Sequence, residues 1–87
     1  MKEKLKMTMI DLGNDWSWSL QKEIQELLFS LDGFGWWSIR GKNLQQKPIR
    51  IIFIWDDGFM TFSQSRQYHY EYKHKEITVE QLKEILK

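Results

Sequence analysis

Hydrophobic residues recur along this chain with two different periods, which predict a domain containing both strands and helices. In residues 4–12 they alternate with polar residues, and a period of two is typical of a half-buried strand. In residues 16–31 they follow spacings of three and four, which places one apolar stripe along a helix. Gln21 and Gln25 fall outside the stripe, so we expect them on the polar side of this helix.

The ends of the first helix carry capping residues. Asp15, Ser17 and Ser19 are all candidates for the N-cap, since each offers a short oxygen-bearing side chain. Gly33 stands where a glycine commonly ends a helix.

The closing segment, residues 75–87, predicts a second, shorter helix. Thr78 and Gln81 have the spacing of a capping box, and Ile77 and Leu82 have that of a hydrophobic staple. The apolar stripe comprises Val79, Leu82, Ile85 and Leu86.

The middle of the chain predicts several strands. Residues 36–40 form a short candidate, and residues 49–55 are the most β-prone stretch of the sequence. Residues 59–65 begin a return strand, and residues 66–73 alternate again, which indicates a further strand or an extended segment.

The dipeptide Asp57-Gly58 predicts a tight two-residue hairpin turn between residues 49–55 and 59–65. Such a turn would put five large apolar residues on a core face: Ile51, Phe53, Trp55, Met60 and Phe62. The opposite face would then carry Arg50, Ile52, Ile54, Thr61, Ser63 and Ser65. A loop at Asp56-Asp57 would keep the same two groups. A three-residue loop would mix them, because a shift of one residue turns side chains to the other face.

These elements occur in the order β-α-β-β-β-α, which predicts the α+β fold class. We expect one domain over residues 1–87, in two layers, with an antiparallel sheet of three to four strands and both helices on one face.

Adjacent tryptophans pose a question about the second sheet face. Side chains alternate along a strand, so Trp36 and Trp37 cannot both point into one core. We expect Trp37 on the face opposite the helices, beside Ile52 and Ile54, and this apolar patch to be rimmed by Arg40 and Arg50. The alternative is that the first strand, the N-terminal arm or the tyrosine segment covers the patch.

Composition narrows the class of protein. The 87 residues include no cysteine, which fits a reducing cytoplasm and leaves apolar packing as the source of stability. A net charge of +1 is neither the basic excess of a generic nucleic-acid binder nor the acidic excess of a DNA mimic. The sequence has no apolar run long enough to span a membrane and no block resembling a signal peptide, so we expect no membrane partner.

Catalytic and metal-binding patterns do not emerge from the sequence. His69 and His74 are five residues apart, which suits neither one helix face nor one strand face. Ser63 or Ser65 with His69 lacks a third residue to orient the pair. We therefore expect no enzyme, no metal and no cofactor.

Two kinds of binding remain open. A protein partner, or a second copy of the chain, would occupy the patch around Trp37. Aromatic and basic residues together could instead stack the bases of a single-stranded nucleic acid or a nucleotide, through Trp37, Tyr68, Tyr70, Arg40 and Arg50.

The organisation of the chain resembles that of small accessory proteins of phages and prophages in low-GC bacteria. The resemblance rests on the segment QKEIQELLFSL, followed by a glycine and tryptophan segment, a hairpin and the closing KEITVEQLKEIL. The resemblance implies a non-enzymatic protein of the host cell cytoplasm. It also implies an inhibitor of a host or defence protein, such as an anti-CRISPR, as the function.

Overall fold

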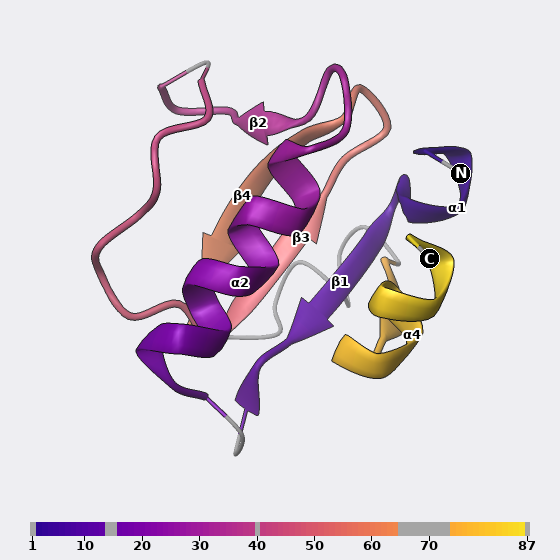
Figure 1. Ribbon diagram of the computed structural model, residues 1–87. Helices are drawn as coiled ribbons and strands as arrows, with labels where there is room; N and C mark the ends of the chain where they lie inside the picture. The colour runs from indigo at the N-terminus through magenta and orange to yellow at the C-terminus, as the bar shows by residue number, and fades with distance from the viewer. Residues whose placement is uncertain (1, 14–15, 40, 65–73, 87) are drawn as a thin grey trace.

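The computed structural model describes residues 2–13, 16–39, 41–64 and 74–86. Its strands are β1 (Thr8–Asp11), β2 (Gly35–Trp36), β3 (Ile51–Ile54), β4 (Phe59–Ser63) and β5 (Lys75–Ile77). Its helices are α1 (Lys2–Leu5), α2 (Trp18–Phe29) and α4 (Val79–Ile85) (Figure 1). The predicted α+β class is confirmed. Residues 66–73, which the sequence indicates as a further strand, lie outside the described residues.

The strands form one mixed, five-stranded sheet in the order β2-β4-β3-β1-β5. The two central pairs, β1 with β3 and β3 with β4, are antiparallel, whereas β1 with β5 and β2 with β4 are parallel. We expected three to four antiparallel strands. The described residues instead form five strands, and two of the strand pairs are parallel. Parallel pairs need long connections, and here those connections place β2 and β5 at the two edges.

The β3–β4 hairpin has a three-residue loop at Asp56, Asp57 and Gly58, instead of the two-residue turn that we expected. Ile54 pairs with Met60, and the backbone N–H of Trp55 donates to the carbonyl of Phe59 over 3.0 Å. Gly58 adopts a φ of 87°, as the last residue of such loops commonly does. The longer loop mixes the two predicted face groups.

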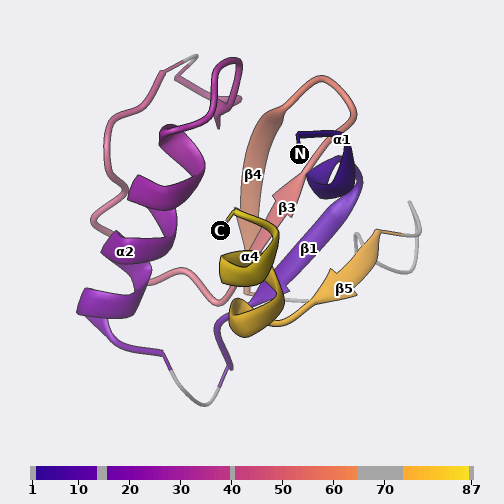
Figure 2. The ribbon, with the colours of Figure 1, turned by 45° about the vertical axis from the view of Figure 1, so that its right-hand side comes forward.

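The face that receives the helices carries the larger core cluster. α2 contributes Ile24 and Leu28 to it, and α4 contributes Leu82. Sheet residues complete the cluster, among them Ile10, Trp36, Ile52, Ile54 and Met60. Figure 1 shows α2 crossing in front of β3 and β4, and Figure 2 shows α4 in front of the sheet; both helices contribute to the cluster on this face.

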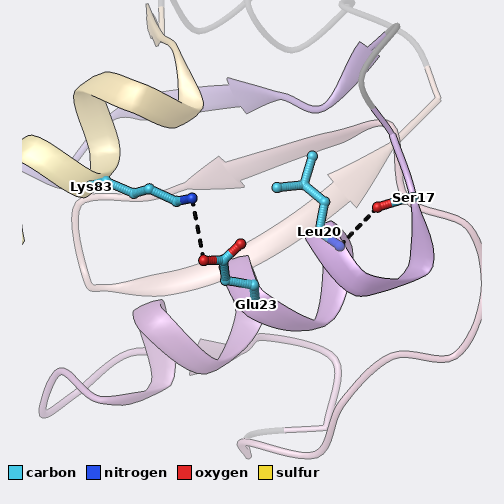
Figure 3. A network of polar contacts seen from close by, with 4 residues as sticks. All are labelled: Ser17, Leu20, Glu23 and Lys83. Carbon is cyan, nitrogen blue, oxygen red and sulfur yellow. Dashed lines mark hydrogen bonds and ion pairs between the residues drawn. The ribbon is translucent and has the colours of Figure 1, made fainter.

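An ion pair joins the two helices at their outer sides. Lys83 Nζ of α4 lies 3.2 Å from Glu23 Oε2 of α2 (Figure 3). Both side chains are about half exposed, so the pair contributes little to stability. The apolar residues beneath it therefore hold the helices on the sheet.

The opposite face of the sheet is also buried. Met9, Ile51 and Phe53 form a second cluster and are each 0% exposed. The His74 ring, which is also fully buried, lies edge-on to Phe53 and Trp55, with centroid distances of 5.2 and 4.5 Å. At these positions the far face is core and not an open surface.

The predicted N-terminal capping signals hold in the structure, whereas Gly33 does not cap α2, whose C-cap is Ser30. Among the three candidates for the N-cap of α2, Ser17 takes the position, and its Oγ accepts from the N–H of Leu20 over 3.0 Å (Figure 3). Thr78 and Gln81 form the predicted capping box of α4. At the other end of α2, Lys42 Nζ donates to the carbonyl of Phe29 over 2.8 Å, which places a cation at the helix C-terminus.

Gln21 of α2 is buried, at 1% exposure, and the expectation that it lies on a polar side is corrected. Its amide nitrogen donates to the carbonyls of Gln45 and Lys47, over 3.1 and 2.8 Å. Its oxygen accepts from the N–H of Ile49 and from Nε1 of Trp16, each over 2.8 Å. One side chain thus binds the β2–β3 connection to the helix.

Gln25, one turn further along α2, is also 1% exposed and is corrected in the same way. Its oxygen accepts from the backbone N–H of Gln45 over 2.7 Å and from Nε1 of Trp36 over 3.1 Å. The long connection therefore follows α2 (Figure 1), and β2 is tied to the same helix.

Two features require glycine at position 58. Its φ is positive, and a Cβ there would lie 2.8 Å from the carbonyl oxygen of Gly33. Gly33→Ala provides a matched control, since Gly33 has a φ of 86° and open space around it. We expect Gly33→Ala to lower the free energy of unfolding by about 1 kcal/mol and Gly58→Ala by about 3 kcal/mol in urea denaturation. Equal losses would contradict the close approach.

Replacing Gln21 tests how much the β2–β3 connection depends on its side-chain amide. We expect Gln21→Leu to lower the free energy of unfolding by about 3 kcal/mol, because it leaves buried backbone groups such as the N–H of Ile49 without a partner. Gln46→Leu, at an exposed position in the same connection, should change it by less than about 0.5 kcal/mol. Urea denaturation of both variants measures the difference, and a near-neutral Gln21→Leu would contradict this role.

Candidate functional site

The structure separates those predicted binding residues that it describes. Trp37 is 53% exposed and lies beside the hairpin loop, whereas Arg50 is exposed at the other end of the same hairpin. Ile52 and Ile54 are 0% exposed in the core beneath the helices. The three-residue loop explains the difference, because it pairs Ile54 with Met60 and Ile52 with Phe62, so that these apolar residues share the face beneath the helices.

The remaining predicted binding residues, Arg40, Tyr68 and Tyr70, lie outside the described residues. Two exposed basic residues, Arg50 and Lys42, already have partners. Arg50 Nε lies 3.9 Å from Asp11 Oδ1, and Lys42 caps α2. Arg50 also lies at the end of the hairpin away from Trp37, so these two residues do not form one aromatic and basic surface.

The paired tryptophans point to opposite faces, as the alternation of strand side chains predicts. Trp36 is 1% exposed, donates its indole N–H to Gln25, and packs edge-on against the rings of Phe29 and Phe62. The backbone N–H of Trp37 donates to the carbonyl of Met60 over 2.9 Å, which extends the pairing with β4 by one residue. The Trp37 side chain is thereby carried to the far face.

A hollow of about 320 Å³ lies beside the hairpin loop on that face, and we call it the Trp37–Trp55 hollow. It is lined by Trp37, Trp55, Asp56, Asp57 and Thr61. Among the described residues that line it, Trp37 is the one that the sequence predicts for the site.

Two hydrogen bonds fix the walls of the Trp37–Trp55 hollow. Trp55 Nε1 donates to Thr61 Oγ1 over 2.9 Å, and its ring lies edge-on to buried His74, so the indole has a defined orientation. Asp57 Oδ1 accepts from the backbone N–H of Phe59 over 2.9 Å, which anchors that carboxylate at the turn. Asp56 and Asp57 are both exposed, so the charged residues that line this hollow in the described part of the chain are acidic.

Two further hollows lie elsewhere. One, of about 330 Å³, lies between α2 and the β2–β3 connection and includes exposed Trp18. Its buried amides, Gln21 and Gln25, are already bonded to that connection. The other, of about 240 Å³, brings Trp16 near Arg50, whose charge is offset by Asp11.

Within residues 2–13, 16–39, 41–64 and 74–86, histidine, cysteine and acidic side chains do not gather in threes around a possible metal position. The pairing of Ser63 or Ser65 with His69 falls largely outside the described residues. In the described part of the chain, no helix is long and apolar enough to cross a membrane.

Comparison with known proteins returns no match: no family model, no curated protein and no solved structure is similar to this chain. The Trp37–Trp55 hollow therefore has to be interpreted from its own chemistry.

Sequence reasoning missed most of the hollow because each residue had a sufficient local explanation. Asp56 and Asp57 read as turn residues, and Trp55 as a core residue. The usable signal was the run Trp55-Asp56-Asp57-Gly58, which puts an indole and two carboxylates at the end of a hairpin.

The different surroundings of the paired tryptophans predict opposite responses to one substitution. We expect Trp36→Phe to lower the free energy of unfolding by about 2 kcal/mol, because it removes buried contacts and leaves Gln25 without its indole donor. Trp37→Phe should lower it by less than about 0.5 kcal/mol, since that side chain is largely exposed. Urea denaturation of both variants provides the comparison, and similar losses would place both rings in the core.

Proposed function

We propose that this chain is a non-catalytic binding module that acts by occupying a surface of another protein through the Trp37 end of its sheet. The observation that carries the proposal is the exposure of Trp37, at 53%, next to fully buried Trp36. A small domain gains stability by burying its aromatic rings, and tryptophans at the centre of protein interfaces supply much of the binding energy. Exposed Ile39, close to Trp37 in the chain, adds apolar surface at 46% exposure.

The resemblance to phage accessory proteins favours one form of this proposal, an inhibitor of a host or defence protein. Such an inhibitor needs no catalytic group, because it acts by covering a surface that its target requires. The Trp37–Trp55 hollow supplies a shaped contact with rings and charges of the kind that gives an interface specificity.

Nucleotide or single-stranded nucleic-acid binding is the second candidate, and the charges of the hollow favour it less. Phosphate groups would approach Asp56 and Asp57, which repel them. The salt dependence of affinity separates the two candidates, because a polyanion interface loses affinity steeply as salt rises.

Immobilised protein should capture a partner from a bacterial host lysate in a Trp37-dependent way. We expect the wild type and Trp18→Ala to retain the same protein and Trp37→Ala to lose it, with melting temperatures that stay within a few degrees of one another. Trp18 is the matched control, because it is 51% exposed and lies on α2, away from the hollow.

The captured protein is then identified by mass spectrometry, purified and titrated against all three chains by calorimetry. A tenfold or greater loss of affinity for Trp37→Ala alone, about 1.4 kcal/mol or more, supports the proposal. Equal affinities of wild type and Trp37→Ala would reject it. Light scattering of the chain alone identifies a homodimer formed through the same surface, which would make a second copy the partner.

A further inference from the structure

The Trp37–Trp55 hollow combines two indole rings with two carboxylates, a combination that suits a cation. We propose that this hollow binds the protonated side chain of a lysine presented by the partner protein. This inference rests on the proposed function and adds the chemistry of the contact.

Indole faces attract cations, because the quadrupole of an aromatic ring is negative on its face. Trp37 follows β2 and Trp55 follows β3, the two strands that flank β4, and both line the same hollow, so a single ammonium group can approach both rings. The hydrogen bond from Trp55 Nε1 to Thr61 holds one of these rings before a ligand arrives. A fixed ring binds at a lower entropic cost than one that becomes ordered on binding.

The two carboxylates add charge complementarity. Asp57 is anchored through its hydrogen bond from Phe59, so one acceptor has a fixed position, and Asp56 adds a second negative charge beside it. An ammonium group donates up to three hydrogen bonds, and these carboxylate oxygens can accept them. A purely apolar side chain would leave both charges without such a partner.

The size of the hollow favours one side chain over a larger ligand. Its volume of about 320 Å³ lies at the small end of the range for ligand pockets, roughly 300–1,000 Å³. A lysine can lay its four methylene groups along the rings while its ammonium group reaches the rim. The same rings that bury the stem therefore also attract the charge.

The test uses the intact chain and two probes that differ in one group: Nα-acetyl-lysine methylamide and its norleucine counterpart. The readout is the ¹H–¹⁵N NMR signal of the Trp37 and Trp55 indoles and of the backbone around Asp57, assigned with Trp→Phe variants. We expect the lysine probe to shift these signals saturably, with a Kd in the millimolar range, and the norleucine probe to bind at least about fivefold more weakly.

Two variants separate the contributions of charge and ring. Asp56→Asn with Asp57→Asn keeps the acceptor for Phe59 but removes both charges, and we expect the lysine probe to bind about fivefold more weakly. Glu26→Gln with Glu80→Gln removes the same charge from exposed positions on α2 and α4 and should leave binding unchanged. Trp37→Leu keeps apolar area without a π face, and it should weaken binding about threefold.

Three outcomes would overturn the proposal. The first is that the norleucine probe binds as tightly as the lysine probe. The second is that both charge-removing pairs of substitutions weaken binding of the lysine probe equally. The third is that the indole signals do not shift at about 100 mM lysine probe, the Kd expected from the smallest such contacts. Each of these would leave the Trp37-dependent capture of a partner standing, because apolar contact alone could produce it. Loss of the capture result with an intact lysine response would instead reject the proposed function and retain the cation site.

Discussion

Two buried glutamine side chains on α2 hold the long connection between β2 and β3, and the arrangement of the sheet depends on them. Gln21 and Gln25 bind backbone groups at Gln45, Lys47 and Ile49 that would otherwise lie against the helix without partners. Burying an amide is costly unless its hydrogen bonds are made, so the connection and the helix must dock together. That requirement sets the path of the chain between β2 and β3.

The same constraint positions β2 and therefore the paired tryptophans. Gln25 accepts from the Trp36 indole as well as from the connection, so the inward-facing ring is tied to α2. Once Trp36 points inward and β2 pairs with β4, the alternation of side chains turns Trp37 to the far face. The exposure of Trp37 is thus a consequence of how its neighbour is buried.

The residues that stabilise the sheet and those that form the candidate site lie in different parts of it. Both faces are fully buried along β3, where Ile51 to Ile54 contribute alternately to the two clusters. The Trp37–Trp55 hollow lies at the loop end of the hairpin, and the charged residues that line it in the described part of the chain are turn residues. A scaffold packed on both faces holds these side chains in place, which lowers the entropic cost of binding a partner.

The sequence by itself determined the α+β class, the apolar stripes of the two longer helices, the capping box at Thr78, and the opposite directions of Trp36 and Trp37. These features follow from short-range periodicity and local hydrogen bonding, which neighbouring residues decide. Only the tertiary structure decided the hairpin register, the burial of Gln21 and Gln25, and the composition of the hollow. The run Asp56-Asp57-Gly58 is compatible with loops of two or three residues, and that single residue sets which face every later side chain occupies. The glutamines occupy helix positions that are typical of a polar side, and they are buried because a segment 20 or more residues away supplies hydrogen-bond partners for them.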